Sequence, residues 1–448
     1  MKTALLIDDD AIFRKVSGKW LRDAGWNTLE ADDGEKGISM ALEHRPDLVV
    51  CDLLMPRCNG FHVCRALRQN REVLPSTKII VTTSSIYGVD QINALEAGAD
   101  AYLVKPIKPS EFLNSIERLF LKGGDTTAFL RGHKVGAPST RGPAPSAVTE
   151  ADRTLVRFWG VRGSIPTPGS ATAYYGGNTS CVEVRAEGQL IILDAGSGIR
   201  PLGVALGAEF KDRPLHCTLL ISHTHWDHIQ GFPFFAPAYN PRNSVRILGY
   251  EGSSAGLQAT LSGQMESPYF PVGWKQLPSN ISIEELKEMQ FTLGPVQVKT
   301  SFLNHPGICV GYRIISRHGS VAYLPDNEPF QHRSNNGTEM LQHVRREEER
   351  LTEFIRGVDV LIIDSQYDSA EYSSHVGWGH GCIEDVVSLA LEAKVKQLYL
   401  FHHDPSHDDE FISKMVLKAR AIAQQKKSRI LIDAAREGLE INFPVTQL

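Results

Sequence analysis

Residues 217–228 read Cys-Thr-Leu-Leu-Ile-Ser-His-Thr-His-Trp-Asp-His, an apolar run that ends in four possible metal ligands. The first six residues have the length and composition of a buried strand. The possible ligands are His223, His225, Asp227 and His228. Imidazole and carboxylate groups suit zinc, iron or manganese, and a rigid strand end can hold them around two adjacent ions. A lone histidine in a loop is usually solvated, but three with an aspartate at this spacing predict a metal site.

Length and charge limit the architecture and the partners. The chain of 448 residues predicts two or three domains at about 150 residues each. Its 47 lysines and arginines are scattered among 52 acidic residues, and the formal net charge is −5. Because phosphate neutralisation needs a concentrated positive surface, a long nucleic acid is not expected as a partner.

The cysteines and the apolar segments predict a cytoplasmic protein. The seven cysteines are odd in number and include no CxxC pair, which is typical of reduced thiols. The apolar start of the chain, residues 4–7, runs into aspartates and is too short for a signal peptide. No stretch approaches the roughly 20 apolar residues that cross a bilayer, so no membrane partner is expected.

Residues 1–121 alternate short apolar runs with helical patterns. The apolar runs span residues 4–7, 27–31, 48–51, 78–82 and 101–104. Alternation of this kind predicts an α/β domain with a doubly wound, parallel five-stranded sheet. Helices then cover both faces, and functional groups lie at the carboxyl ends of the strands.

Charged side chains follow these predicted strands. Asp8 and Asp9 follow the first strand and Asp52 the third, while Thr82 and Lys105 follow the fourth and fifth. Three carboxylates in one pocket repel one another, and a Mg²⁺ ion relieves that repulsion. A lysine and a hydroxyl beside them suit a phosphoryl group carried on the third-strand aspartate.

This segment resembles the receiver domain of chemotaxis-type response regulators. Residues 52–56, Asp-Leu-Leu-Met-Pro, with Gly60 downstream, match the phospho-acceptor motif of that family. Residues 102–106, Tyr-Leu-Val-Lys-Pro, match its fifth-strand motif. The resemblance implies that Thr82 and Tyr102 form the switch pair.

The same resemblance implies the chemistry and the partners of the domain. Asp52 would accept the phosphoryl group, Asp8 and Asp9 would bind Mg²⁺, and Lys105 would contact the phosphate. A cognate sensor histidine kinase would be the partner, and homodimerisation through the receiver is a family expectation.

Residues 122–152 predict a flexible linker. They are rich in glycine, proline and serine, with few apolar residues and no periodicity. Such a composition buries too little surface to offset its chain entropy.

Residues 153–448 combine short strands with glycine-rich turns, which fits two sheets packed face to face with helices outside. Two ions need about seven protein donors, so further ligands should follow further strands. His305 precedes a strand, Asp326 ends one, and His402 and His403 end the last clear one. Adjacent residues of a strand point to opposite faces, so only one of this last pair can be a ligand.

This order of motifs resembles the metallo-β-lactamase superfamily over residues 154 to about 440, which implies an αββα sandwich. One ion would be held by His223, His225 and His305, the other by Asp227, His228 and His402, with Asp326 bridging. His402 is favoured over His403, because the proline that follows the strand then lies where the family has it. Asp194 matches an early aspartate of the family that orients a ligand histidine.

Two later stretches resemble the phosphodiesterase branch of that superfamily, which includes tRNase Z. Residues 361–367 place Asp364 after an apolar strand, and residues 377–382 place His380 before a helix. The resemblance implies that His380 protonates the leaving group and that Asp364 fixes the tautomer of His380. The predicted catalytic residues are His380, Asp364 and Asp227. The alternative is that His380 only caps the helix.

Two further features bear on the substrate. Asn178 lies on a glycine-rich loop and is a weaker candidate for a phosphate contact. Residues 231–277 are rich in aromatic side chains and proline, and nothing there resembles the tRNA-gripping arm of tRNase Z. These aromatic side chains form either a local core or a wall that stacks on the bases of a small nucleotide.

Together these features predict a two-component response regulator with a dinuclear phosphodiesterase as output. A cyclic nucleotide or cyclic dinucleotide is the expected substrate, and phosphorylation of Asp52 the expected control. Zinc is expected at the dinuclear site, with iron or manganese as alternatives, and Mg²⁺ in the receiver.

Two other functions stay open. A lactonase or thioesterase of the same fold would not need His380. A non-hydrolytic diiron sensor or oxidoreductase would also fit a receiver fusion, but redox members of the superfamily usually carry an acidic residue where His225 stands.

Overall fold

The computed structural model describes residues 2–55, 58–83, 91, 94–95, 97–121, 154–250, 256–267, 269–330 and 337–443. The predicted linker over residues 122–152 lies outside the described residues. No described helix is both long enough and apolar enough to cross a membrane.

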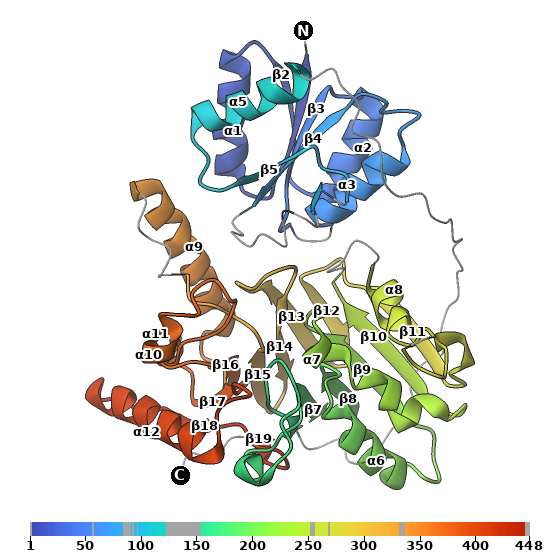
Figure 1. The fold of residues 1–448 in the computed structure, drawn as a ribbon, viewed down its shortest axis with the longest axis vertical. Helices are drawn as coiled ribbons and strands as arrows, with labels where there is room; N and C mark the ends of the chain where they lie inside the picture. The colour runs from blue at the N-terminus through green and yellow to red at the C-terminus, as the bar shows by residue number, and fades with distance from the viewer. Residues whose placement is uncertain are drawn as a thin grey trace.

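The N-terminal domain is built on five parallel strands in the order β2-β1-β3-β4-β5. The strands are β1 (Thr3–Ile7), β2 (Asn27–Ala31), β3 (Leu48–Asp52), β4 (Lys78–Thr83) and β5 (Ala101–Val104). The helices are α1 (Ala11–Asp23), α2 (Gly34–His44), α3 (Gly60–Gln69) and α5 (Pro109–Leu121). Helices α1 and α5 cover one face of the sheet and α2 and α3 the other (Figure 1). The predicted doubly wound parallel sheet is confirmed.

The two faces of this sheet bury alternate side chains of the same strand. Leu5 and Ile7 of β1 belong to the apolar cluster that contains Phe61 of α3. Leu6 lies on the opposite face with Phe112 of α5. All five side chains are at most 1% exposed, and burying an aliphatic or aromatic side chain stabilises a fold by about 1.5–3 kcal/mol.

The C-terminal domain contains two seven-stranded sheets. The first has the order β11-β10-β9-β8-β7-β6-β19 and the second β12-β13-β14-β15-β16-β17-β18. The strands of the first are β6 (Thr154–Gly160), β7 (Cys181–Ala186), β8 (Gln189–Leu193), β9 (His216–Ile221), β10 (Ser244–Gly249), β11 (Asn280–Glu285) and β19 (Glu440–Phe443). Those of the second are β12 (Gln290–Leu293), β13 (Val296–Phe302), β14 (Val310–Ser316), β15 (Gly319–Leu324), β16 (Val360–Asp364), β17 (Gln397–Phe401) and β18 (Leu431–Ala434).

Helices lie on the outer faces of both sheets (Figure 1). The α-helices are α6 (Ile199–Glu209), α7 (Trp226–Ile229), α8 (Gly256–Gly263), α9 (Gly337–Ile355), α10 (Ser369–Tyr372), α11 (Ile383–Glu392) and α12 (Asp409–Gln425). Short 3₁₀ helices are η1 (Ser170–Thr172), η2 (Phe232–Phe234), η3 (Ala236–Tyr239) and η4 (Trp274–Gln276).

The main core of this domain lies between its two sheets. Val184 and Ile191 of the first sheet and Val298 and Tyr312 of the second are fully buried in one apolar cluster. Separate clusters lie beneath α6 on one outer face and beneath α11 and α12 on the other. The predicted αββα layering is therefore confirmed.

The fold brings the candidate site residues to one rim of the sandwich. Strands β8 and β9 are parallel in one sheet, and β15, β16 and β17 are parallel in the other. Asp194 follows β8 and His223 comes two residues after β9, while Asp326, Asp364 and His402 lie at the ends of the other three. Because parallel strands end at the same edge of a sheet, residues far apart in the sequence meet there.

Candidate metal centre

One group of donors surrounds the first expected ion position. His223, His225, His305 and Asp326 each place a possible ligand atom within 4.8 Å of the others. Oδ2 of Asp326 lies 3.7 Å from Nε2 of His223 and 3.6 Å from Nε2 of His305. Nδ1 of His225 lies 3.1 Å from Nε2 of His305. The four side chains therefore converge as the sequence predicted.

A second group lies on the other side of the same aspartate. Asp227, His228 and His402 also form a set whose ligand atoms lie within 4.8 Å of one another. Oδ1 of Asp326 lies 3.1 Å from Nε2 of His228 and 3.4 Å from Nε2 of His402. One oxygen of Asp326 thus faces each group, which is the placement that a bridging carboxylate needs.

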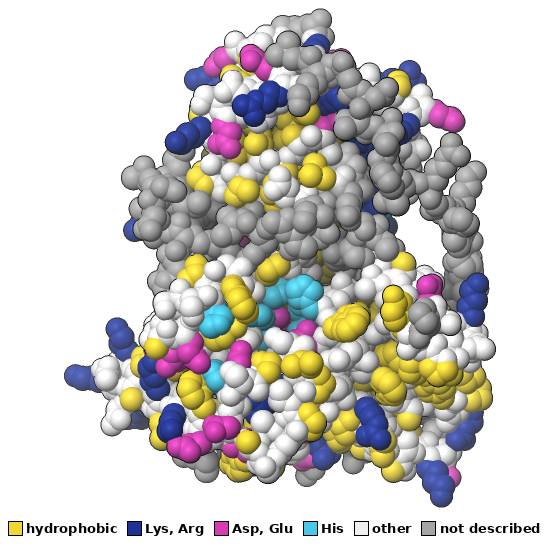
Figure 2. Space-filling model, in the orientation of Figure 1, with side chains coloured by type: hydrophobic (Ala, Val, Ile, Leu, Met, Phe, Trp, Pro, Cys, Tyr) yellow, Lys and Arg dark blue, Asp and Glu magenta, His cyan; other side chains and the backbone are white. Residues whose placement is uncertain are grey.

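The chemistry of these groups fits a pair of divalent cations. Nε2 of His223, Nε2 of His228 and Oδ1 of Asp326 are buried, and none of them makes a hydrogen bond within the part of the chain that the structure describes. Buried polar atoms without a partner are costly, and bound cations would satisfy all three together. Figure 2 shows histidine side chains gathered beside acidic ones on this face of the molecule.

The backbone and nearby polar groups fix the orientation of the histidines. Nδ1 of His228 lies 2.8 Å from Asp194, and Nδ1 of His305 lies 2.9 Å from the carbonyl of Gly379. Nδ1 of His402 lies 3.1 Å from Oε1 of Gln366. A hydrogen on each Nδ1 leaves the Nε2 lone pair for a metal, which is the usual arrangement of a ligand histidine.

Asp194 is fully buried and sits at the centre of its own hydrogen-bond network. It accepts hydrogen bonds from the backbone and hydroxyl of Ser222 and from the hydroxyl of Tyr323, all between 2.7 and 2.8 Å. Its φ of 60° places a non-glycine residue in the left-handed region, and such strain persists where contacts over-determine it. Asp194 therefore holds His228 rather than facing the ion positions.

Burial sets the protonation of the first group. It lowers the pKa of His223 and His225, and it lowers the pKa of His305 to about 3. These imidazoles are therefore neutral near pH 7, the form that binds a metal. Burial alone would raise the pKa of Asp326, but His228 and His402 of the second group outweigh it and hold that pKa well below its usual range.

His403 points away from the cluster. Its Nε2 lies 2.9 Å from the carbonyl oxygen of Ala435, whereas Nε2 of the adjacent His402 lies 3.0 Å from Asp227. His402 has a φ of 60°, which turns the chain at the end of β17. The structure therefore brings His402, and not His403, to the other donors.

His380 and Asp364 form a pair beside the donors. Nδ1 of His380 lies 3.0 Å from Oδ2 of Asp364, and the ring stacks on His402 with centroids 5.0 Å apart. Burial alone would lower the pKa of His380, but the Asp364 carboxylate outweighs it and raises the pKa to about 9. The N-cap of α11 is Cys382, so His380 does not take the capping position that was its alternative role.

Asn178 is not brought to the cluster. Its amide nitrogen donates to Glu437 at 3.0 Å, and its amide oxygen accepts a hydrogen bond from Ser197 at 3.0 Å. A carboxylate beside the amide disfavours a phosphate at the same place. The side chain instead ties its glycine-rich loop to the chain near β19.

The aromatic segment over residues 231–277 divides between two roles. Phe232 and Phe235 are fully buried in the cluster beneath α6, so they are core residues. Phe234 and Tyr269 are exposed. The pattern of the sequence did not separate these two groups.

Three residues beside the site were not predicted from the sequence: Ser164, Gln366 and Glu328. Ser164 donates its backbone N–H to Oδ2 of Asp227 at 2.8 Å, and Gln366 links His402 to Asp404. Glu328 is buried two residues beyond Asp326. The available signal was position, since Gln366 and Glu328 each follow a predicted strand end by two residues.

The receiver pocket has the predicted charges in place. Nζ of Lys105 lies 2.8 Å from Asp8 and 2.7 Å from Asp52, and both carboxylates are buried. Asp8, Asp9 and Asp52 form a cluster that could hold a cation. Burial, together with the charge of Asp52, raises the pKa of Asp8 to about 7. A Mg²⁺ ion would favour the ionised form of these carboxyls.

The predicted switch pair lies on adjacent strands. Thr82 is fully buried in β4, and its hydroxyl lies 3.5 Å from the carbonyl oxygen of Cys51. Tyr102 is half-buried in β5, where it pairs in register with Val81. Thr82 also pairs in register with Asp52, while Tyr102 lies on the adjacent strand at the edge of the sheet.

Comparison with known proteins identifies both domains. The family described as response regulator receiver domain matches residues 4–117, and the beta-lactamase superfamily domain matches residues 190–403. The DNA-binding response regulator MtrA of Mycobacterium tuberculosis is 36% identical over 124 residues, which cover 28% of this chain and 53% of that protein. The chain thus spans about half the length of this curated relative.

Solved structures similar to each part are also known. The metallo-beta-lactamase fold protein YhfI of Bacillus subtilis is 16% identical, covers 65% of this chain and all of its own, and gives a TM-score of 0.46. The chemotaxis protein CheY4 of Vibrio cholerae is 28% identical, covers 27% of this chain and 98% of its own, and gives a TM-score of 0.26. The two family matches show that residues 4–117 form a response regulator receiver domain and that residues 190–403 belong to a domain of the beta-lactamase superfamily.

Proposed function

We propose that the C-terminal domain is a dinuclear metal-dependent phosphodiesterase, the output of a two-component response regulator in the cytoplasm. The observation that carries the proposal is the His380–Asp364 pair, 3.0 Å apart, beside seven converging donors. The donors alone support any hydrolase of this fold. The expulsion of an alkoxide from phosphorus requires a proton donor, and an imidazole that a carboxylate orients can serve as one.

The seven donors fit two ions with a shared carboxylate. His223, His225 and His305 would hold one ion, Asp227, His228 and His402 the other, with Asp326 between them. Because most of these donors are imidazoles, we assign zinc to both positions, with iron or manganese as alternatives. When bound, divalent ions acidify water and neutralise charge on phosphoryl oxygens.

The residues of the chain then supply the proton. Asp364 accepts the hydrogen bond from Nδ1 of His380, which fixes the tautomer and keeps the ring oriented. Nε2 of His380 is the remaining atom that can give a proton to the departing oxygen. Asp364 is itself held by the backbone N–H groups of Asn327 and Gln366, at 3.2 and 3.0 Å.

Exposed tryptophans support a small nucleotide as substrate. Trp226 lies between the ligands His225 and Asp227 in sequence and is 76% exposed, and Trp378 lies two residues before His380 and is 59% exposed. Hydrophobic side chains flank the histidines on this face in Figure 2. Exposed indole rings beside a phosphodiester site can stack on bases. We therefore propose a cyclic nucleotide or cyclic dinucleotide.

A substrate panel tests this function. The purified protein is assayed with bis-p-nitrophenyl phosphate, cyclic mononucleotides, cyclic dinucleotides and an acyl lactone, with and without a phosphoryl donor. Phosphodiester turnover that exceeds lactone turnover supports the proposal. The reverse order would instead favour the lactonase alternative.

A diiron sensor or oxidoreductase is the other alternative. His225 lies within the first donor group, where redox relatives usually place a carboxylate. Elemental analysis and an optical spectrum of the purified protein separate the cases. Iron with a visible absorption band and no phosphodiester turnover would overturn the hydrolase proposal.

We further propose that phosphorylation of Asp52 by a sensor histidine kinase controls the hydrolase through contacts between the domains. Nζ of Lys287, in the turn after β11, lies 3.5 Å from Glu35 of α2. Nη1 of Arg346 in α9 lies 3.6 Å from Asp10, next to the acidic pocket of the receiver. Figure 1 shows the receiver beside the end of the sandwich that carries α7.

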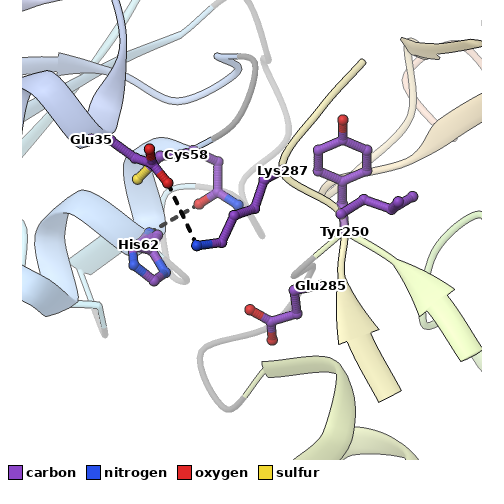
Figure 3. A pocket seen from close by; sticks show the side chains of 8 residues that line it. Glu35, Cys58, His62, Tyr250, Glu285 and Lys287 are labelled. Carbon is purple, nitrogen blue, oxygen red and sulfur yellow. Dashed lines mark hydrogen bonds and ion pairs between the residues drawn. The ribbon is translucent and has the colours of Figure 1, made fainter. Parts of the chain in front are cut away.

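The contact between Lys287 and Glu35 lies at a cavity that residues of both domains line. A cavity of about 40 Å³ separates the domains here, and Figure 3 shows Lys287 reaching across it toward Glu35. Cys58 lines the cavity from the loop that follows Asp52, and Tyr250 lines it from the end of β10. Since β10 is parallel to β9, Tyr250 lies at the same rim as the ligands after β9.

Exchanging the two charges tests this coupling. We expect Glu35→Lys or Lys287→Glu to raise the turnover of the unphosphorylated protein by less than about fivefold, because exposed ion pairs are weak. The double variant should return to the wild-type rate. Unchanged rates in all three variants would contradict the coupling. Arg246→Glu is the control, because Arg246 pairs with Glu284 within the first sheet.

A further inference from the structure

Glu328 is a buried carboxylate with three hydrogen-bond donors. It is 1% exposed and lies two residues after Asp326. Its Oε1 accepts hydrogen bonds from the hydroxyl of Tyr372 at 2.8 Å and from the N–H of Gly377 at 2.6 Å. Its Oε2 accepts one from the N–H of Gly379 at 3.0 Å. Hydrogen bonds to a carboxylate are about twice as strong as neutral ones, so the two from Gly377 and Gly379 fix the turn over residues 377–379.

The backbone of Glu328 is anchored to the other side of the site. Its N–H donates to the carbonyl of Asn304 at 2.9 Å, and the side-chain amide of Asn304 donates to the carbonyl of Glu328 at 2.7 Å. Asn304 immediately precedes His305. Glu328 therefore connects the segment before one candidate ligand to the turn before His380.

The turn that Glu328 holds acts on two site residues. The carbonyl of Gly379 accepts the hydrogen bond from Nδ1 of His305 at 2.9 Å, and His380 is the next residue. Gly379 has a φ of 89°, and a Cβ there would lie 2.4 Å from Nδ1 of His305. The turn thus approaches His305 so closely that its position sets the distance between His305 and His380.

We infer that Glu328 is a positioning residue that places His380 for proton donation through the turn over residues 377–379. This inference rests on the proposed phosphodiesterase function. A glutamine at the same position keeps the size but offers one oxygen in place of two. Its amide nitrogen would then oppose an N–H of the turn, and the turn would shift.

Comparing two substrates tests the inference. One phosphodiester has a p-nitrophenolate leaving group, which departs without a proton, and the other has an alkoxide leaving group, which needs one. We expect Glu328→Gln to lower kcat on the alkoxide substrate by about 10- to 100-fold with an unchanged KM. The p-nitrophenyl substrate should lose less than about threefold, since it needs no proton donor.

One control variant and one measurement test for a merely structural role. Tyr372→Phe removes one donor but keeps both backbone N–H groups, so its kcat should stay within about threefold of wild type. Metal content measured by elemental analysis should be unchanged in Glu328→Gln. Equal losses on both substrates, or loss of metal, would overturn the positioning role.

A spectroscopic readout separates this inference from the proposed function. The imidazole N–H proton of His380, bonded to Asp364, is assigned in the downfield proton NMR spectrum by its absence in His380→Ala. We expect Glu328→Gln to shift or broaden this signal and Tyr372→Phe to preserve it. An unchanged signal in Glu328→Gln would overturn the inference even if no phosphodiester is turned over. A shifted signal without turnover would support the positioning role and reject only the proposed function.

Discussion

Asp326→Ala should abolish metal binding at both positions and lower phosphodiester turnover by more than about 100-fold. The reason is its location between the two donor groups, with Oδ2 facing His223 and His305 and Oδ1 facing the other group. Removing the carboxylate also removes the negative charge that balances two dications in a buried site. The measurement is metal content per chain by elemental analysis, followed by turnover of the best substrate.

A matched substitution isolates this effect. Asp433→Asn changes an exposed carboxylate of β18 and should leave both metal content and turnover within about twofold of wild type. Full metal occupancy in Asp326→Ala would show that the carboxylate does not bridge, and the assignment of seven donors to two ions would then be wrong.

Removal of metal should lower turnover, as is expected of Asp326→Ala. A chelator should inactivate the wild-type hydrolase, and added zinc should restore it. Among the described residues, Nε2 of His223 and Nε2 of His228 make no hydrogen bond, so loss of bound ions would leave these buried atoms unsatisfied and should also lower the melting temperature. Chelation that leaves both turnover and melting temperature unchanged would contradict a metal-dependent site.

The residues of the two donor groups were predictable because their signal is local. His223, Asp326 and His402 each lie at or just after the end of an apolar strand, and parallel strands end at one rim. The sequence also placed Asp364 after such a strand. Strand ends supplied the candidates, and the resemblance to the metallo-β-lactamase superfamily selected among them, as in the choice of His402 over His403.

Glu328 could not be predicted, because its role depends on partners that the sequence does not place. The described donors lie 44 to 51 positions further along the chain, in α10 and in the turn over residues 377–379, and only the folded structure brings them to Glu328. The burial of each aromatic residue could not be predicted for a similar reason. Phe232 and Phe234 have the same local composition, yet one is fully buried and the other 55% exposed.

The contacts between the domains could not be predicted from the sequence either. Glu35 and Lys287 are exposed charges of a kind that occurs throughout the chain, and no periodicity distinguishes them. Their pairing depends on how two independently recognisable domains lie against each other. The sequence therefore predicted each domain but not the contacts between the two.

His380→Ala should lower kcat on a phosphodiester with an alkoxide leaving group by about 10²- to 10⁴-fold, the usual contribution of a general acid. That loss equals about 3–5 kcal/mol of activation free energy. A p-nitrophenolate leaves without protonation, so bis-p-nitrophenyl phosphate should be turned over within a few-fold of the wild-type rate. The two rates are measured on the same preparation with its metal content known.

The contrast between the substrates is what identifies the proton donor. A ligand or a structural histidine would slow both reactions equally, because both need the same ions and the same fold. His216→Ala, at the exposed start of β9 and away from the rim, is the matched control and should leave both rates near wild type. Asp364→Asn should repeat the selective loss, since Nδ1 of His380 would then face an amide in place of a carboxylate. If both substrates slow to the same extent in His380→Ala, then His380 serves the ions or the fold, and the cleavage of a poor leaving group must be assisted by another residue.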